Sequence, residues 1–210
     1  MELTNLSSMQ LDVLREIGNI GAGNAITSMS TFLNKRIEMQ LPSVEIVTFN
    51  EMMELLGGPE KVVVAMLFRI YGEAKGTVYF ILSIEEAESL VNELSAGVTL
   101  NFFGEEEPDE FAISILKEVG NIMTGSYLTA LSDFTQINMQ PSIPYLAVDM
   151  LGSILTDGLI ELSRVSDYAI MVDTEISDYE QHGIRGHFLL LPEYESLQKI
   201  FTALGVNGHG

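Results

Sequence analysis

The sequence contains no cysteine and few basic residues. Without cysteine, disulfide bonds, zinc–thiolate sites and thiol chemistry are excluded, and we expect a cytoplasmic protein. Lysine and arginine together number 10, against 30 aspartates and glutamates, so the formal net charge is −20. A surface of this charge repels the phosphate backbone of nucleic acids and anionic lipid headgroups, so we expect neither as a partner.

Signals for secretion, membrane insertion or metal binding are also missing. The first ten residues hold no basic segment and no apolar segment, so we expect no signal peptide. The longest apolar runs, such as residues 62–68, are too short to span a bilayer and favour buried strands. The histidines His182, His187 and His209 lack metal-site spacing, and we interpret each as a surface or hydrogen-bonded residue. We therefore expect no membrane insertion and no metal site.

A glycine-rich segment lies close to the N-terminus, at residues 15–27. A dinucleotide-binding loop has the pattern G-x-G-x-x-G directly after a strand. Gly21 and Gly23 match its first two glycines, but Ile26 fills the third place, and residues 9–17 have the apolar spacing of a helix. The segment is therefore not interpreted as a dinucleotide site. The simplest alternative is a helix whose small residues let another element pack closely.

The same segment occurs a second time. Residues 14–32 align with residues 116–134 at a constant offset of 102, and nine of the nineteen positions are identical. Pro42 and Pro144 keep this offset. A period of this length is too long for a solenoid, so it indicates two copies of one unit related by a pseudo-two-fold axis.

Both halves show the same order of expected elements: helix, short strand, short helix, two strands and helix. We expect them at 8–34, 43–49, 50–57, 61–71, 75–83 and 84–95, and again at 109–135, 144–149, 150–161, 167–176, 184–191 and 193–204. Ser83 and Glu86 form a capping-box pair before the last helix of the first half. Residues 97–110 read as the linker between the halves.

These elements predict an α/β (α+β) fold with an internal duplication. Residues 1–210 should form one domain made of two repeats, about 1–103 and 104–210, which share a core. Their strands should form a largely antiparallel or mixed sheet, continuous or in two abutting parts. Two long helices should pack against the sheet, each with one exposed face. Hydrophobic residues make up 47% of the chain, which is enough for a sizeable core.

The repeated helix has one apolar face. A helical wheel places on it Leu11, Leu14, Ile17, Gly21, Ala25, Met29 and Phe32, and in the second copy Ile113, Leu116, Val119, Met123, Tyr127, Leu131 and Phe134. We expect both helices to bury this face.

The opposite face repeats a polar pattern. The first copy has Asp12, Glu16, Asn19 and Gly23, and the second has Ser114, Glu118, Asn121 and Gly125. Glutamate and asparagine three residues apart lie side by side on a helix, and the glycine leaves room for a partner's backbone. A Gly-Asn pair in mid-helix costs about 1 kcal/mol relative to alanine, so its presence twice indicates a function. The alternative for Glu16 is an ordinary solvated residue.

An exposed Glu/Asn pair is an incomplete active site. Asparagine can hold a water through hydrogen bonds but cannot accept a proton at neutral pH, whereas glutamate can pair with a cation or act as a base. The pattern supplies no nucleophile and no phosphate cradle. The Glu/Asn pair would be sufficient for catalysis if a phosphorylated partner brought the acyl phosphate and its Mg²⁺, because the reaction would then need only an oriented water.

With these residues the chain resembles the CheC/CheX/FliY family of chemotaxis phosphatases. The family signature is Asp or Ser, Glu four residues later, Asn three residues after that, and Pro twenty-three residues further on. Both copies match it in full, with Pro42 and Pro144 as the last positions. The resemblance extends over essentially the whole chain.

The resemblance implies hydrolysis of the aspartyl phosphate of the response regulator CheY. Both signature asparagines would orient the attacking water, and both glutamates would contact the regulator through its active-site lysine. Asp12 and Ser114 would border the docking surface, and the two prolines would shape the following strand. The protein would need no cofactor of its own, since Mg²⁺ would be held by the phosphorylated partner. Serine at position 114 leaves open a difference in strength between the two sites.

The family also implies a second partner, the receptor-modifying deamidase CheD. Its contact would lie away from the Glu/Asn faces, and our candidate is residues 145–158, a mainly apolar segment in which Asp149 stands out. The alternative for this segment is a strand followed by a core helix. Two other functions stay open: a non-catalytic module that binds phosphorylated CheY, and an adaptor that acts mainly through CheD. The chain ends at Gly210, so we expect no extra switch domain of the FliY kind.

Overall fold

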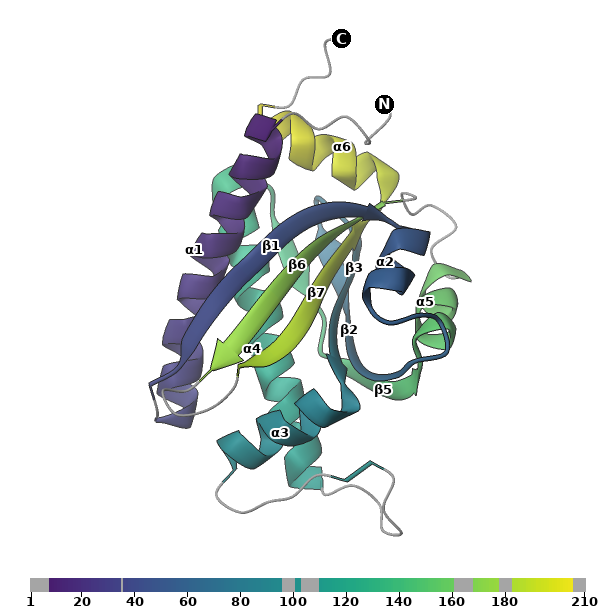
Figure 1. The fold of residues 1–210 in the computed structure, drawn as a ribbon. Helices are drawn as coiled ribbons and strands as arrows, with labels where there is room; N and C mark the ends of the chain where they lie inside the picture. The colour runs from purple at the N-terminus through teal and green to yellow at the C-terminus, as the bar shows by residue number, and fades with distance from the viewer. Residues whose placement is uncertain are drawn as a thin grey trace.

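One curled antiparallel sheet carries helices on both faces (Figure 1). The structure is a computed structural model, and it describes residues 8–34, 36–95, 101–102, 110–160, 168–177 and 183–205. The helices are α1 (Ser8–Leu33), α2 (Phe49–Leu55), α3 (Ile84–Leu94), α4 (Glu110–Thr135), α5 (Leu151–Ile160) and α6 (Tyr194–Ala203). The strands are β1 (Glu38–Thr48), β2 (Val62–Gly72), β3 (Gly76–Ser83), β4 (Met139–Pro141), β5 (Tyr145–Met150), β6 (Tyr168–Ser177) and β7 (Ile184–Pro192).

The strand order interleaves the two halves of the sequence. The sheet runs β1-β6-β7-β3-β2, and both β4 and β5 pair with β2 at the last edge. The order is symmetric, because β1 and β5 occupy equivalent places in the two halves, as do β2 and β6, and β3 and β7. Each half therefore donates its first strand to the sheet of the other half. The predicted α/β fold class with a largely antiparallel sheet is confirmed, and the symmetric strand order is in keeping with the predicted duplication.

Most expected elements lie within two residues of their predicted ends. The capping box of Ser83 and Glu86 before α3 is confirmed. Two strands differ from the prediction. β1 begins at Glu38 and continues past Pro42 through a register shift between Gln40 and Ser43, since proline has no N–H to donate to the ladder. β4 has only three residues, too few to show a strand periodicity in the sequence.

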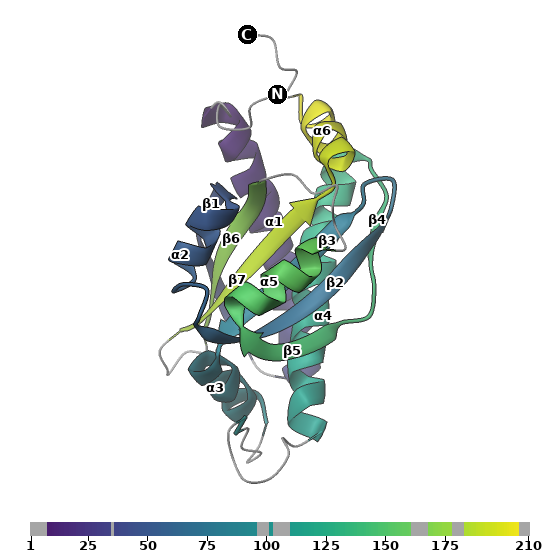
Figure 2. The same ribbon diagram turned by 90° about the vertical axis from the view of Figure 1, so that its right-hand side faces the viewer.

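The sheet is covered on both faces, and this explains its long apolar runs. Along β3, Phe80 and Leu82 belong to the core beneath α1 and α4, whereas Tyr79 and Ile81 belong to a second core beneath α2 and α5. Figure 2 shows α5 on this second face. A strand buried on both faces carries few polar residues, so alternation is lost.

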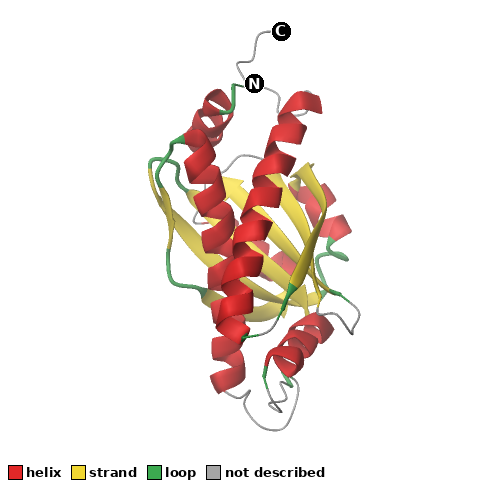
Figure 3. Ribbon diagram, turned by 90° about the vertical axis from the view of Figure 1, so that its left-hand side faces the viewer, coloured by secondary structure: helices red, strands yellow, loops and turns green. Residues whose placement is uncertain are grey.

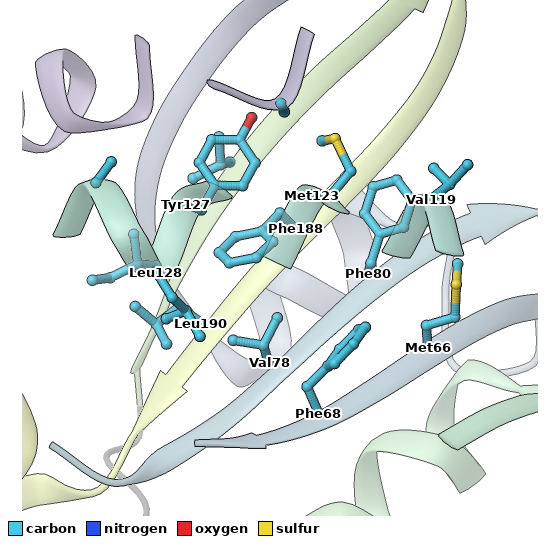
Figure 4. Packing of buried hydrophobic residues seen from close by; sticks show 14 of the residues in the cluster. Met66, Phe68, Val78, Phe80, Val119, Met123, Tyr127, Leu128, Phe188 and Leu190 are labelled. Carbon is cyan, nitrogen blue, oxygen red and sulfur yellow. The ribbon is translucent and has the colours of Figure 1, made fainter. Parts of the chain in front are cut away.

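The larger core is aromatic at its centre (Figure 4). The rings of Tyr127 on α4 and Phe188 on β7 lie with their centroids 4.7 Å apart. Phe80 is fully buried and pairs with Phe188 across the β3–β7 ladder, at the middle of the sheet. Burial raises the pKa of the Tyr127 hydroxyl, which therefore stays protonated.

Glycine lets the long helices approach one another. A Cβ atom at Gly21 would lie 2.5 Å from Cδ1 and 3.1 Å from Cα of Tyr127, so α1 and α4 are in close contact at this point. A Cβ atom at Gly120 would lie 2.7 Å from the sulfur of Met66 on β2. Both glycines therefore allow close internal packing. For Gly21 this is the role that the simplest interpretation of the sequence predicted.

The predicted apolar face of both helices is buried along most of its length but not at its C-terminal end. Phe32 and Phe134 are each 48% exposed, so their assignment to the core is wrong. Two packed helices cross at an angle and separate toward their ends, which leaves the last turn of each without a full cover. Leu11 and Ile113, at the opposite ends, are only partly buried.

We predict opposite effects on stability for alanine at two neighbouring glycines. Gly21→Ala should lower the free energy of unfolding by about 1–3 kcal/mol, because its methyl group overlaps the ring of Tyr127 and crowds the backbone of α4. Gly23→Ala should raise it by up to about 1 kcal/mol, because nothing lies within 4 Å and alanine favours helix. Urea denaturation measures both; equal changes would contradict the packing described.

A second prediction concerns acid stability. Asp173 accepts a hydrogen bond from Nδ1 of His187 at 2.6 Å and another from Oγ of Ser43 at 3.0 Å, so His187 is a hydrogen-bonded histidine as expected. The bond from His187 lowers the pKa of Asp173 below its usual range.

A carboxylate with a lowered pKa in the folded state stabilises the fold above its unfolded pKa, and this contribution is lost as pH falls through the folded value. Asp173→Asn should therefore lower the free energy of unfolding by about 1–2 kcal/mol at pH 7. The difference from the wild type should shrink below about pH 4, near the ordinary pKa of aspartate. Thermal unfolding across pH 3–7 measures this; a difference that does not change with pH would contradict it.

Candidate functional site

The two long helices lie side by side and run in opposite directions across one face of the sheet (Figure 3). Gly21 of α1 lies against Tyr127 of α4, Thr27 and Asn121 line one groove along the helix pair, and Phe32 and Glu118 line another. Along these contacts the residue numbers rise on α1 while they fall on α4, as expected for antiparallel helices. The polar face of each helix therefore points away from the sheet on the same side of the molecule.

The first Glu/Asn pair is open to solvent. Asp12, Glu16, Asn19 and Gly23 are all exposed along α1. Asp12 accepts a hydrogen bond from Nη1 of Arg15 at 2.8 Å, which places a cation next to the carboxylate at the edge of the pair. A Cβ atom at Gly23 would meet nothing within 4 Å, so the helix surface is bare at this point.

The second pair is less exposed than the first. Asn121 and Ser114 are exposed on α4, whereas Glu118 and Gly125 are partly buried. The hydroxyl of Ser114 donates a hydrogen bond to the carbonyl of Glu110 at 2.8 Å, so it is held along its own helix. A Cβ atom at Gly125 would also meet nothing within 4 Å.

Asn121 lies in a shallow groove between the two helices. Its other lining residues are Asn24, Thr27, Ser28, Ile122, Gly125, Ser126 and Thr129. Nearly all of them are small and polar. Thr27 is eight residues from Asn19, about 12 Å along the axis of α1, so the two Glu/Asn pairs form separate sites.

Glu118 and Ser114 border a different groove, lined otherwise by apolar side chains. These come from α1, α3 and α4, and they are Phe32, Leu94, Phe111 and Ile115. The helical pattern predicted a buried Phe32 and did not single out Phe111. Phe111 is 60% exposed at the second residue of α4. The signal available in the sequence was its spacing, because a phenylalanine two turns before Glu118 lies on the same helix face as the signature residues.

The prolines of the signature lie at corresponding places after the long helices. Pro42 lies in β1 at the register shift between Gln40 and Ser43, and Pro144 directly precedes β5. Neither lies on α1 or α4, in keeping with the structural role expected of them.

Asp149 lies on another part of the molecule, near the end of the edge strand β5. It is exposed, and its Oδ1 accepts a hydrogen bond from the backbone N–H of Met150 at 2.7 Å. The candidate segment 145–158 divides into two parts. β5 keeps exposed side chains, with Tyr145 68% exposed, whereas Leu151 and Leu155 of α5 are buried in the second core.

The chemistry available on the helix pair is limited. Each site offers one carboxylate and one amide on a rigid helix, and a neutral amide can hold a water in place without taking its proton. Among the residues that the structure describes, no cluster of three or more histidines, aspartates or glutamates could hold a metal ion. No helix in this described part is long and apolar enough to cross a membrane.

Comparison with known proteins gives a consistent result. The model of the CheC-like family matches residues 9–46 and 111–145, which contain both copies of the signature. The chain is 39% identical to the CheY-P phosphatase CheC of Bacillus subtilis (strain 168), over 94% of this chain and 95% of that protein. It is 26% identical to the flagellar motor switch phosphatase FliY of the same organism, over 62% of this chain and 33% of that protein.

Solved structures share the fold. Thermotoga maritima FliY superposes with a TM-score of 0.71 at 20% identity, covering 96% of this chain and 99% of that one. The FliM middle domain from H. pylori gives a TM-score of 0.66 at 20% identity, covering 94% of this chain and 99% of that one. At this level of identity the likeness concerns the fold alone.

Proposed function

This chain belongs to the CheC-like family, and from that premise we propose that it is a phosphatase that hydrolyses the aspartyl phosphate of the response regulator CheY. The observation that carries the proposal is the presentation of two complete Glu/Asn pairs on rigid, solvent-exposed helix faces, each followed by a bare glycine. The relative named CheY-P phosphatase CheC supports the reaction and its substrate.

In the proposed reaction, Asn19 or Asn121 holds a water in line with the phosphorus atom through hydrogen bonds of its side-chain amide. The water oxygen forms a bond to phosphorus while the bond to the aspartyl oxygen breaks, which releases inorganic phosphate and restores the carboxylate. Positioning of this kind accounts for a substantial part of the rate in phosphoryl transfer. Mg²⁺ held by the regulator would neutralise charge on the phosphoryl group.

Glu16 and Glu118 are proposed to anchor the regulator, by pairing with the lysine next to its phosphorylated aspartate. A carboxylate is suited to this role because ion pairing fixes the distance between the two proteins without competing for the water. Gly23 and Gly125 lie one helical turn beyond each asparagine, so the partner's backbone can come close to the helix there. Asp12 and Ser114 border the docking surface.

A second partner, the deamidase CheD, is proposed to contact β5 around Asp149, on the side of the molecule away from the Glu/Asn pairs. The exposed side chains of this edge strand, Tyr145 and Met150 among them, favour an interaction surface for this part of the segment. An adaptor role through CheD is compatible with catalysis. We also propose a cytoplasmic location, in keeping with the absence of cysteine.

We predict that the double variant Asn19→Ala, Asn121→Ala loses most of the acceleration of CheY dephosphorylation, about 100-fold or more, because the water is no longer oriented. Its binding to phosphorylated CheY should persist, since both glutamates remain. Decay of acyl-phosphorylated CheY and a parallel binding measurement test this. Asn50→Ala, an exposed helical asparagine on α2, is the matched control.

The possible outcomes separate the functions under consideration. A wild type that binds phosphorylated CheY without shortening its lifetime would make the protein a binding module. A double variant as active as the wild type would remove both asparagines from the mechanism. If the variant loses binding and activity together, the asparagines belong to the docking contact rather than to water positioning.

We further predict that Asp149→Arg weakens binding to CheD at least about tenfold, because it places a reversed charge in the proposed contact. Hydrolysis of phosphorylated CheY should stay unchanged, since β5 lies apart from both Glu/Asn pairs. Titration calorimetry with purified CheD measures the first effect, and Glu195→Arg on α6 is the charge-matched control. Equal weakening by both variants would show an effect of net charge instead.

A further inference from the structure

We infer that Phe32, Phe111 and Leu94 form an apolar docking patch for the phosphorylated regulator beside the second Glu/Asn pair. The inference rests on the proposed function and extends it. Its unusual element is Phe32, because this side chain comes from α1 whereas Ser114, Glu118 and Asn121 come from α4. The second site thus has its signature residues on α4 and part of its apolar border on α1.

The patch is continuous with the proposed site. Phe32, 48% exposed, and Phe111, 60% exposed, line one groove with Ser114 and Glu118, which are two of the signature positions. Asn121 lies one helical turn beyond Glu118 on the same face. A protein that brings its phosphate to Asn121 and pairs a lysine with Glu118 therefore also covers the two rings.

The grouping of these side chains is informative, whereas a single exposed phenylalanine would not be. Three separate elements, α1, α3 and α4, bring their apolar side chains to one groove beside a carboxylate. Apolar groups that gather in this way mark interaction sites. Aromatic residues in particular are enriched at the centres of protein interfaces, where a few of them supply most of the affinity.

The charge of the protein also favours an apolar contact with the regulator. The net charge is −20, and the group to be hydrolysed is itself an anion, so long-range attraction does not draw the phosphorylated group toward the helix pair. Affinity must then come from short-range contacts at the site. Burial of the exposed rings supplies a favourable contact that does not depend on charge.

The geometry also predicts a counterpart at the first site. Phe134 has the same offset of 102 from Phe32 and the same exposure of 48%. The offset that relates Phe32 to Phe134 also relates Glu118 to Glu16, so the duplication predicts that Phe134 borders the first site near Glu16. Each site would then take one phenylalanine from the other repeat.

The test uses the full chain with the first site disabled by Glu16→Lys and Asn19→Ala, so that the second site alone acts. Binding is measured with CheY activated by beryllofluoride, a stable mimic of the acyl phosphate, and hydrolysis is measured with phosphorylated CheY. Phe32→Ala and Phe111→Ala should each weaken binding about tenfold and raise KM similarly. The kcat should change less than about twofold, because the water-orienting amide is untouched.

Two further variants control for folding and for loss of surface area. Phe32→Leu keeps an apolar side chain and should retain most of the binding. Tyr194→Ala removes a ring of similar exposure, 47%, on α6 and should change neither binding nor KM. Thermal unfolding confirms that each variant is folded.

The outcomes distinguish this inference from the proposed function. Unchanged binding in both phenylalanine variants overturns the patch and leaves the phosphatase function intact. A parent protein that binds activated CheY without hydrolysing phosphorylated CheY overturns catalysis at this site, while the phenylalanine variants still decide the patch. A parent that does not bind activated CheY at all overturns both. Equal losses in the Tyr194 variant overturn the patch as well.

Discussion

The close contact of α1 with α4 at Gly21 is the constraint on which the functional surface depends. With no side chain there, Tyr127 of α4 packs directly against α1, and this sets how closely the two helices approach. Helices that bury one face against a sheet and against each other have only one face left for solvent. Both Glu/Asn pairs lie on that face, so the packing of the core determines how they are presented.

The sheet below holds this arrangement in place. Its central ladder joins β3 and β7, one strand from each repeat, and its outer pairs join β1 to β6 and β5 to β2. Neither repeat can complete its own part of the sheet, because each depends on an edge strand from the other. Burial of both sheet faces then makes the two helices parts of one rigid scaffold. A rigid scaffold suits a site whose proposed task is to hold a water molecule in one position.

The two grooves along the helix pair differ in their lining, one polar and one apolar. Around Asn121 the lining is small and polar, in keeping with the proposed binding of a phosphoryl group and its water. Around Glu118 it is aromatic and aliphatic, which suits a protein contact. The first pair, with Asp12 next to Arg15, is more open and more charged. The two copies therefore share their signature but differ in their surroundings.

From the amino-acid sequence alone one could predict the internal repeat, the succession of helices and strands along the chain, most of the buried face of each long helix and the candidate pairs Glu16/Asn19 and Glu118/Asn121. These follow from periodicity and from an exact offset, which are properties of neighbouring residues along the chain. The tertiary structure alone decided the interleaved strand order and the exposure of Phe32. It also decided the groove that joins Phe32 to Glu118. These depend on where helices separate and on which strands meet, and contacts between residues far apart in sequence leave no local pattern to read.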